Sequence, residues 1–540
     1  MKKSALLLLF VFISSISFAQ EVPTPNYRQA AKYSPKNLAK LVHSTSVSPH
    51  WLKKGNRFWY QYKTSEGSNY YIVDADRKTR RKLFDNVKMA KWLTEITKDP
   101  YDGKHLPRFS FKFNKAENAI RFRVTSTEEV PKVDEKKKGK KAKKGKPKME
   151  KKVYHLEYRL GGNGLTIIDN KKDERKWKRW ANIAPDSSIV LFSKNFNIFW
   201  MDKANFLKAV KDEKDSTIVE HQWTKDGVEN YGYGGGGRGE NNETKLKNKD
   251  KRKGVWGTWS HDSNKFVFQK SDSRKIKDLW VINSVSSKRP VLETYKYHMP
   301  GEPEFSKKEL MIFDTRTKRI VNVELDTVKQ QSVSVFRAPS KQSSRDDLFR
   351  PSLLLSKKGK LYYSVISRDR KKYDICVADL ETGKSKVLIE ERFNTYIESR
   401  PLILFNDETE MLHWAERDGW AHFYLYDSNG KLKNQVTDGD YHVARFSGLD
   451  EKSRTLYFTA NGVNKKQDPY FAHTYKINLN GSGMRTLNPG DFTSRSSMSD
   501  SNKYFVSNFS RVNTVPKSEL RSADGRLVMK LEEADLSQLF

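Results

Sequence analysis

A serine nucleophile is the first chemistry for which the sequence can be searched. A catalytic serine on a strand-turn-helix elbow needs the pentapeptide G-x-S-x-G, because small residues let the backbone turn sharply there. No such pentapeptide occurs in the 540 residues. Ser482 lies in Asn480-Gly481-Ser482-Gly483, which lacks this spacing and has the composition of a hairpin turn. We therefore predict no catalytic residues for acyl transfer in this chain.

Patterns that bind metals or phosphates are equally sparse. His298 and Glu302 flank a Met-Pro-Gly turn, but two ligands are too few for a metal site. Cys376 is the only cysteine, and we expect it to pack in the core. The stretch 226–254 is rich in glycine but lacks the Lys-Ser or Lys-Thr that follows a phosphate-binding loop. We expect a flexible loop there, no metal and no cofactor.

The elements that would position any site are short strands in a repeated pattern. Apolar residues alternate through Leu412, Trp414, Phe423 and Leu425, and Asp-Gly and Asn-Gly pairs separate the runs. Similar strands recur as YYIVD (70–74), IFWMD (198–202), LWVIN (279–283), LMIFD (310–314), ICVAD (375–379), FYLYD (423–427) and TYKIN (474–478). Each small sheet needs another sheet against both of its faces. The repeats therefore predict an all-β fold, a β-propeller of seven or eight four-stranded antiparallel blades.

The first residues carry a targeting signal. Lys2 and Lys3 precede the apolar run ALLLLFVFI, and Ser17-Phe18-Ala19 follows with small residues. This is the pattern of a secretory signal peptide, which we place at 1–19. We expect an exported bacterial protein, periplasmic or secreted, without a transmembrane span after removal of the signal. Residues 20–47 form a polar N-terminal segment with a short helix predicted at 36–42.

The formal net charge of +36 is concentrated in part in one segment. Residues 132–152 contain 12 lysines against three acidic residues, and they lie between the strand-like runs RFRVT and YHLEY. A segment with so few apolar residues is typical of a solvated insertion. Tethering to an anionic surface and nucleic-acid binding are the alternatives. Nucleic-acid binding rests on charge alone and conflicts with export, so we expect no nucleic-acid partner.

Three runs carry a resemblance to a known family. They are LETYKYHMPGEPE (292–304), ERDGWAHFYLYDSNGKLKNQVTDGDY (416–441) and SELRSADGRLVMKLEEADLSQL (518–539). In this order they resemble the N-terminal propeller of the dipeptidyl peptidase IV family of the prolyl oligopeptidase group. The resemblance implies eight blades, here within 48–517, and a C-terminal α/β-hydrolase domain that removes dipeptides, typically with proline second. Residues 518–540 would then be a linker toward a hydrolase domain that this sequence lacks.

The resemblance also indicates where a peptide substrate would be held. Family members place glutamates shortly before a Trp-Ser strand start, where paired carboxylates bind the protonated amino terminus of the peptide. The matching strand start is 258–260, but the preceding residues 249–253 are KDKRK, which have the wrong charge for binding an amine. The remaining candidates for substrate binding are Glu229, Glu240 and Glu243, which lie further upstream.

The resemblance leaves two functions open. In the first, the chain is the propeller portion of an exported serine dipeptidyl peptidase. It gates access, binds the peptide amino terminus and docks a hydrolase domain supplied elsewhere, and it is inactive alone. In the second, it is a free-standing propeller that binds a peptide, a glycan or an envelope protein without catalysis. A homo-oligomer is possible in both cases.

Overall fold

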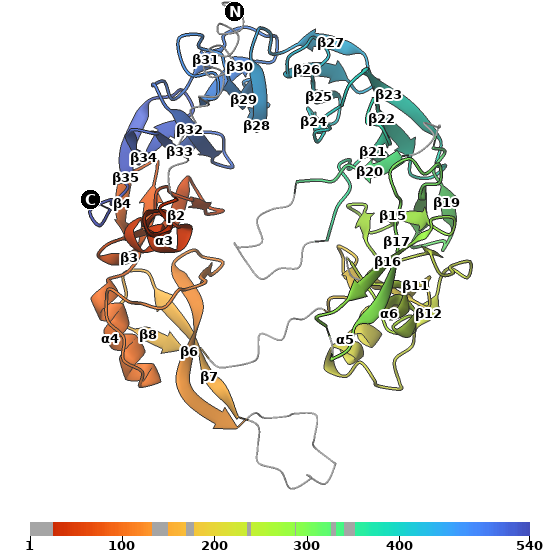
Figure 1. Ribbon diagram of the computed structural model, residues 1–540, viewed down its shortest axis with the longest axis horizontal. Helices are drawn as coiled ribbons and strands as arrows, with labels where there is room; N and C mark the ends of the chain where they lie inside the picture. Colours follow the sequence, from red (N-terminus) through yellow and green to blue (C-terminus); the bar gives the residue numbers. More distant parts are fainter. Residues whose placement is uncertain are drawn as a thin grey trace, which may run out of the picture.

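Antiparallel strands make up most of the chain. The computed structural model describes residues 25–131, 149–168, 178–234, 239–286, 288–325, 331–339 and 351–539. The described strands form nine sheets, of which eight have four or five strands and one has two. The eight larger sheets stand side by side around a ring (Figure 1). The prediction of an all-β propeller with eight antiparallel blades is therefore confirmed.

The first four blades come from residues 50–322. The first sheet contains β1 (His50–Trp51), β2 (Arg57–Thr64), β3 (Gly67–Asp74) and β4 (Thr79–Lys82). The second contains β5 (Lys112–Phe113), β6 (Ala119–Pro131), β7 (Met149–Arg159) and β8 (Leu165–Ile167). The third contains β9 (Asn182–Ile183), β10 (Ile189–Lys194), β11 (Asn197–Asp202) and β12 (His221–Gln222). The fourth contains β13 (Tyr231–Gly232), β14 (Gly257–Trp259), β15 (Lys265–Asp272), β18 (Lys307–Asp314) and β19 (Ile320–Asn322).

The last four blades follow in chain order. The fifth sheet contains β20 (Gln331–Val335), β21 (Lys360–Ser367), β22 (Lys372–Asp379) and β23 (Ser385–Arg392). The sixth contains β24 (Ile403–Phe405), β25 (Glu410–Ala415), β26 (His422–Asp427) and β27 (Leu432–Gln435). The seventh contains β28 (His442–Asp450), β29 (Thr455–Asn461), β30 (Ala472–Asn478) and β31 (Arg485–Thr486). The eighth contains β32 (Thr493–Met498), β33 (Tyr504–Arg511), β34 (Thr514–Ser522) and β35 (Leu527–Glu533).

The core lies between neighbouring blades, because alternate residues of a strand point to opposite faces of its sheet. In β25, Met411 packs in a cluster with Ile375 of the fifth sheet. Leu412 and Trp414 instead pack in a cluster with Leu456 of the seventh sheet. In a central strand of a blade, both alternating sets of side chains are therefore apolar, because neighbouring blades cover both faces of the sheet.

The first and last blades also pack against each other. Phe58 and Tyr60 of β2 share a buried cluster with Val506 and Leu531 of the eighth sheet. The hydroxyl of Tyr60 donates a hydrogen bond of 2.8 Å to the Glu532 carboxylate. Residues separated by more than 400 positions thus join the two ends of the propeller.

The second blade has one polar face. In β6, Ile120, Phe122 and Val124 are buried, whereas the alternating Arg121 and Arg123 are exposed. No buried apolar cluster among the described residues joins this blade to the third, although every other pair of consecutive blades shares one. Figure 1 shows these two sheets wide apart. The packing of the ring is therefore interrupted at this position.

A helix takes the place of a neighbouring blade on the third sheet. The helix α5 (Lys203–Lys211) buries Phe206 and Ala209 against Val190 and Phe192 of β10. Asp202 caps the helix, because its side chain accepts a hydrogen bond from the backbone N–H of Asn205. This face of the third sheet is therefore covered without contact to the second sheet.

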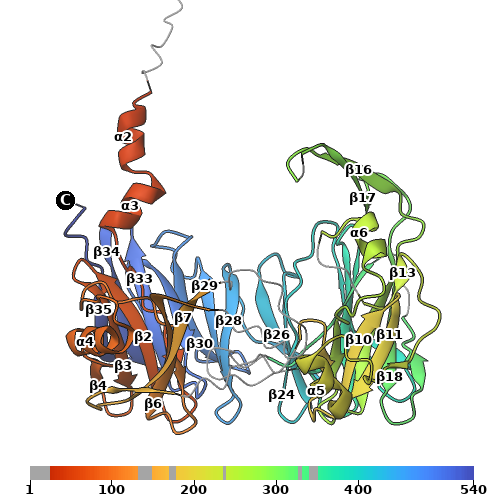
Figure 2. The same ribbon diagram turned by 90° about the horizontal axis from the view of Figure 1, so that it is seen from below.

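The ninth sheet is an arm that leaves the fourth blade. It consists of β16 (Asp278–Asn283) and β17 (Val291–Lys296), which pair only with each other. Figure 2 shows the arm extending beyond one face of the ring. The prediction that LWVIN (279–283) is a blade strand is therefore wrong. Its alternation is that of a strand, but Trp280 and Ile282 are 72% and 71% exposed, so they pack against no blade.

The other helices lie outside the blades. The predicted helix at 36–42 is α3 (Pro35–Leu41), and α2 (Tyr27–Lys32) precedes it. Both extend from the same face of the ring as the arm (Figure 2). The helix α4 (Asn86–Thr97) joins the first two blades and buries Met89 and Leu93 in their shared cluster.

Two predicted segments have more regular structure than expected. Residues 518–540 are not only a linker, because β34 and β35 complete the eighth blade and bury Leu520 and Leu531. Asp524-Gly525 forms the turn between these strands, with Gly525 at positive φ. The Gly-rich segment 226–254 likewise contains β13 and the helix α6 (Asn242–Lys247). The signal peptide 1–19 and most of the Lys-rich insertion 132–152 lie outside the described residues.

Candidate substrate-binding site

The helix α6 fixes the position of the segment in which the resemblance places the substrate glutamates. Asn241 caps the helix by accepting a hydrogen bond of 2.8 Å from the N–H of Thr244. The buried Asn242 amide donates to Asp278 and Thr294 of the arm at 3.0 and 3.1 Å. The arm therefore holds α6 from one side.

The three candidate glutamates lie at the edges of this segment. Glu240 precedes α6, and its carboxylate contacts Lys253 at 3.6 Å and Asn248 at 3.4 Å. Glu243 lies in the first turn of α6 and accepts a hydrogen bond of 2.7 Å from the hydroxyl of Thr294. This hydrogen bond lowers the pKa of Glu243. Glu229 is half-buried in the turn before β13. Glu240 and Glu243 thus share one end of α6, whereas Glu229 lies on a different element.

A cavity of about 990 Å³ lies beside α6, between the third and sixth blades. Six basic residues line it, namely Lys245, Lys249, Lys253, Lys296, Arg337 and Arg400. No aspartate or glutamate belongs to the described lining, and none of the three candidate glutamates does. The cavity has the volume of a ligand site, and its lining favours negative charge.

The basic residues come from separate parts of the chain. Lys245, Lys249 and Lys253 follow one another at intervals of four residues, from α6 into the segment before β14. Lys296 ends β17 of the arm, and Arg400 lies in the connection to β24. The backbone of Lys253 pairs with Ser193 through two hydrogen bonds of 2.8 Å. The third blade thereby fixes the end of this row of lysines.

Apolar residues, uncharged polar residues and glycines form the rest of the wall. Phe268 and Val333 lie on β15 and β20, and Phe336 follows β20. Trp256 lines the cavity and is 73% exposed. No blade covers this tryptophan. An exposed aromatic ring beside basic groups suits a ligand with both charged and apolar parts.

The sequence pointed to part of this site only. The basic run at 249–253 was visible in the sequence, because its charge has the wrong sign for binding an amine. Lys245 lies four residues before Lys249, and this spacing places two side chains on one face of a helix. Lys296, Arg337 and Arg400 carried no such signal, because only the fold brings them beside α6.

The described part of the chain contains no group of three or more His, Cys, Asp or Glu side chains arranged to hold a metal ion. Within the same residues, no helix combines the length and apolar character needed to cross a membrane.

Comparison with protein families identifies the chain. The model of the dipeptidyl peptidase IV (DPP IV) N-terminal region matches residues 240–516, just over half of the sequence. The chain belongs to this family. The match begins at Glu240, immediately before α6, and extends into the eighth blade. The fold and the order of the three sequence runs agree with this assignment.

Curated relatives match over short segments. Dipeptidyl peptidase 4 of Trichophyton equinum is 25% identical over 123 residues, which cover 22% of this chain and 16% of the relative. Dipeptidyl peptidase 4 of Trichophyton rubrum is 26% identical over 131 residues, which cover 23% and 16%. The match therefore spans about one sixth of these relatives.

Solved structures share the fold over nearly the whole chain. A protein of Bacteroides ovatus described as a dipeptidyl aminopeptidase IV superimposes with a TM-score of 0.55 at 15% identity, over 93% of this chain and 62% of that one. Porphyromonas gingivalis dipeptidyl peptidase 4 gives a TM-score of 0.52 at 17% identity, over 91% and 60%. This chain thus spans less than two thirds of both proteins.

Proposed function

We propose that the chain is the propeller portion of an exported bacterial serine peptidase related to dipeptidyl peptidase IV. In this role it controls the access of peptides and holds their amino termini. The family match over residues 240–516 carries the proposal. The 540 residues contain no G-x-S-x-G pentapeptide, and in this role an α/β-hydrolase domain cleaves the peptide.

Two features support gating and export. The interrupted packing between the second and third blades supports gating, because no buried apolar cluster of the described residues holds these two blades together. The run of Lys2, Lys3 and nine apolar residues supports export to the periplasm or beyond.

Amine binding is assigned to Glu229, Glu240 and Glu243. Glu240 lies before α6 and Glu243 in its first turn, and the protonated amine of a peptide would form charge-assisted hydrogen bonds with their carboxylates. To reach the amine, Glu240 has to exchange its contact with Lys253 for the ligand. The amine would then replace Lys253 as the cation beside the Glu240 carboxylate.

Peptide titrations test this assignment. A Gly-Pro-Leu-Gln peptide with a free amino terminus should bind at least fivefold more tightly than its acetylated form at pH 6.5. The double substitution E240Q/E243Q should abolish this difference, while the exposed control E66Q/E451Q keeps it. Equal affinity of the free and acetylated peptides for the unaltered chain would overturn amine binding.

Homo-oligomer formation is a further part of the proposal. The arm exposes a row of apolar side chains, among them Trp280, Ile282, Val285 and Leu292, which are between 55% and 92% exposed. Exposed apolar groups in such number are typical of an interface between proteins. The molar mass in light scattering should exceed that of one chain, and W280S/I282S should lower it to the monomer value. A monomer before substitution would contradict this part.

A further inference from the structure

The row of lysines beside α6 has no function in amine binding, because its charge has the wrong sign. We propose that the cavity lined by Lys245, Lys249 and Lys253 binds an extended peptide segment that carries Asp or Glu side chains. In taking the ligand to be a peptide, this inference rests on the proposed function, and it adds the class of peptide. It does not require that the glutamates bind an amine.

The charges of the lining are incompletely neutralised. Lys253 contacts Glu240, Lys296 contacts Asp278 at 3.3 Å, and Arg400 contacts Glu398 at 2.7 Å. Lys245 and Lys249 form no ion pair with any residue in the described ranges. Several positive charges around one cavity raise its electrostatic potential, and a bound anion lowers the free energy of this arrangement. The unpaired ammonium groups are therefore available to carboxylates of a ligand.

The edge of an inner strand indicates that the anion is a peptide. Strand β20 pairs along one edge with β21, and Val333, Ser334 and Val335 of β20 line the cavity. The side-chain amide of Gln269 donates a hydrogen bond of 2.9 Å to the Val333 carbonyl. This carbonyl therefore points to the cavity side, away from β21, and a peptide N–H would share it with the Gln269 amide or replace that amide. A backbone edge that faces a cavity can bind an extended peptide as an added strand, which a phosphate or a glycan cannot do.

The remaining wall suits alternating side chains. Successive residues of an extended peptide point in opposite directions, so one set can face the lysines and the other the apolar surface. Trp256 and Phe336 supply that apolar surface. The volume of about 990 Å³ is at the upper end for small-ligand sites, which leaves room for several residues.

Fluorescence anisotropy on the full chain tests the proposal. The probe is a dye-labelled hexapeptide of alternating leucine and glutamate, with both ends blocked, so that no free amine contributes. It should bind at least tenfold more tightly than the same peptide with glutamine for glutamate at 100 mM salt. Methylation of alternate backbone nitrogens should weaken binding at least fivefold, because it removes donors to β20.

A charge-matched pair of variants controls for the high net charge of the chain. K245Q/K249Q should weaken binding of the glutamate peptide at least tenfold. K452Q/K503Q removes the same charge from exposed turns of the seventh and eighth blades and should change affinity less than twofold. Melting temperatures of both variants show whether folding is intact.

Three results would overturn the proposal. They are equal losses in the two variants, equal affinity for the glutamate and glutamine peptides, or insensitivity to backbone methylation together with full competition by short polyphosphate. The last result would assign the cavity to free polyanions. Since the probe is blocked at its amino end, none of these results bears on amine binding by Glu240 and Glu243.

Discussion

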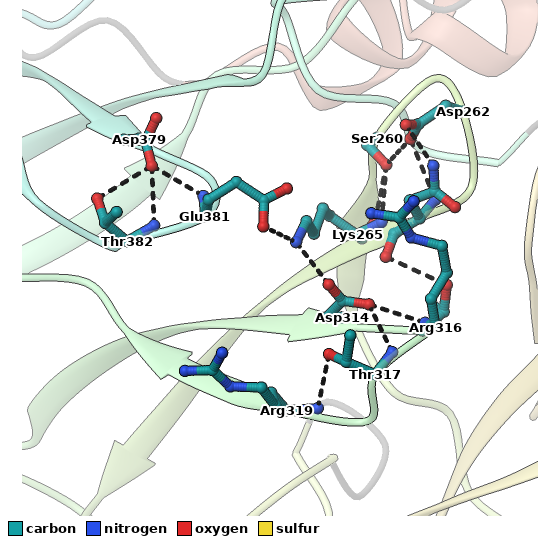
Figure 3. Close-up of polar contacts among 12 residues, drawn as sticks. Ser260, Asp262, Lys265, Asp314, Arg316, Thr317, Arg319, Asp379, Glu381 and Thr382 are labelled. Carbon is teal, nitrogen blue, oxygen red and sulfur yellow. Dashed lines mark hydrogen bonds and ion pairs between the residues drawn. The ribbon is translucent and has the colours of Figure 1, made fainter.

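The ammonium group of Lys265 lies 2.6 Å from the Oε2 atom of Glu381, which belongs to the neighbouring blade (Figure 3). The same ammonium lies 2.7 Å from Oδ2 of Asp314, at the end of β18 in its own blade. Asp379 accepts hydrogen bonds from the N–H groups of Glu381 and Thr382 and so fixes the turn that presents Glu381. One buried cation thus joins the fourth and fifth blades.

Substitution K265M should destabilise the propeller. The Lys265 side chain is 7% exposed and that of Asp314 is 9% exposed, so the change leaves a buried carboxylate without its cation. We expect a loss of about 3 kcal/mol in unfolding free energy and a lower melting temperature. Thermal unfolding measures the effect, with the exposed K452M as the matched control. A melting temperature equal to that of the control would contradict the assigned role.

Acid stability should depend on Glu410, a 4% exposed side chain in β25. Arg454 of the seventh blade donates to it at 2.7 and 3.1 Å, and Lys433 also contacts it. These cations lower the pKa of Glu410 from 4.5 to about 2. The carboxylate therefore contributes stability above about pH 4.5, which is lost as the pH falls toward 2.

The substitution E410Q should remove this part of the pH profile. We expect the unaltered chain to be about 1 to 2 kcal/mol more stable than E410Q at pH 6, after allowing for screening by solvent. The difference should shrink toward pH 2. Urea unfolding between pH 2 and pH 6 measures both curves, and a constant difference across this range would show that Glu410 does not titrate as stated.

The blades could be predicted from the sequence because their signals are local. Asp418-Gly419 and Asn429-Gly430 place the turns of the sixth blade, and alternating apolar residues such as Leu412 and Trp414 give its strands. The arm was missed because a strand pattern does not say which sheet the strand joins. Its residue Trp280 alternates like a blade residue but remains exposed.

The basic cavity depends on contacts between distant segments. Lys249 was visible in the sequence as part of a basic run, but Arg337 and Arg400 lie in loops of the fifth and sixth blades, and only the fold brings them near it. Residues 518–540, which include the end of β34 and all of β35, were assigned to a linker for a related reason. Resemblance located the run 518–539, whereas the pairing of β33 with β34 and of β34 with β35 decides that it belongs to the eighth blade.

Deletion of residues 136–148 should leave stability nearly unchanged. The flanking strands pair up to Pro131 and Met149, so a short connection can replace the insertion. Solvated insertions contribute little folding free energy, and we expect a change of less than about 2 °C in melting temperature. Scanning calorimetry of both chains gives the comparison. A decrease of many degrees would mean that the lysine-rich segment packs against the blades.

Incubation of the purified chain with a Gly-Pro-Leu-Gln peptide tests the central claim, that this propeller holds peptides and leaves cleavage to another domain. Mass spectrometry follows the peptide, and anisotropy measures its binding in the same samples. We expect saturable binding and intact peptide after many hours. Release of Gly-Pro that a serine-directed inhibitor blocks would contradict the account, and so would the absence of any binding.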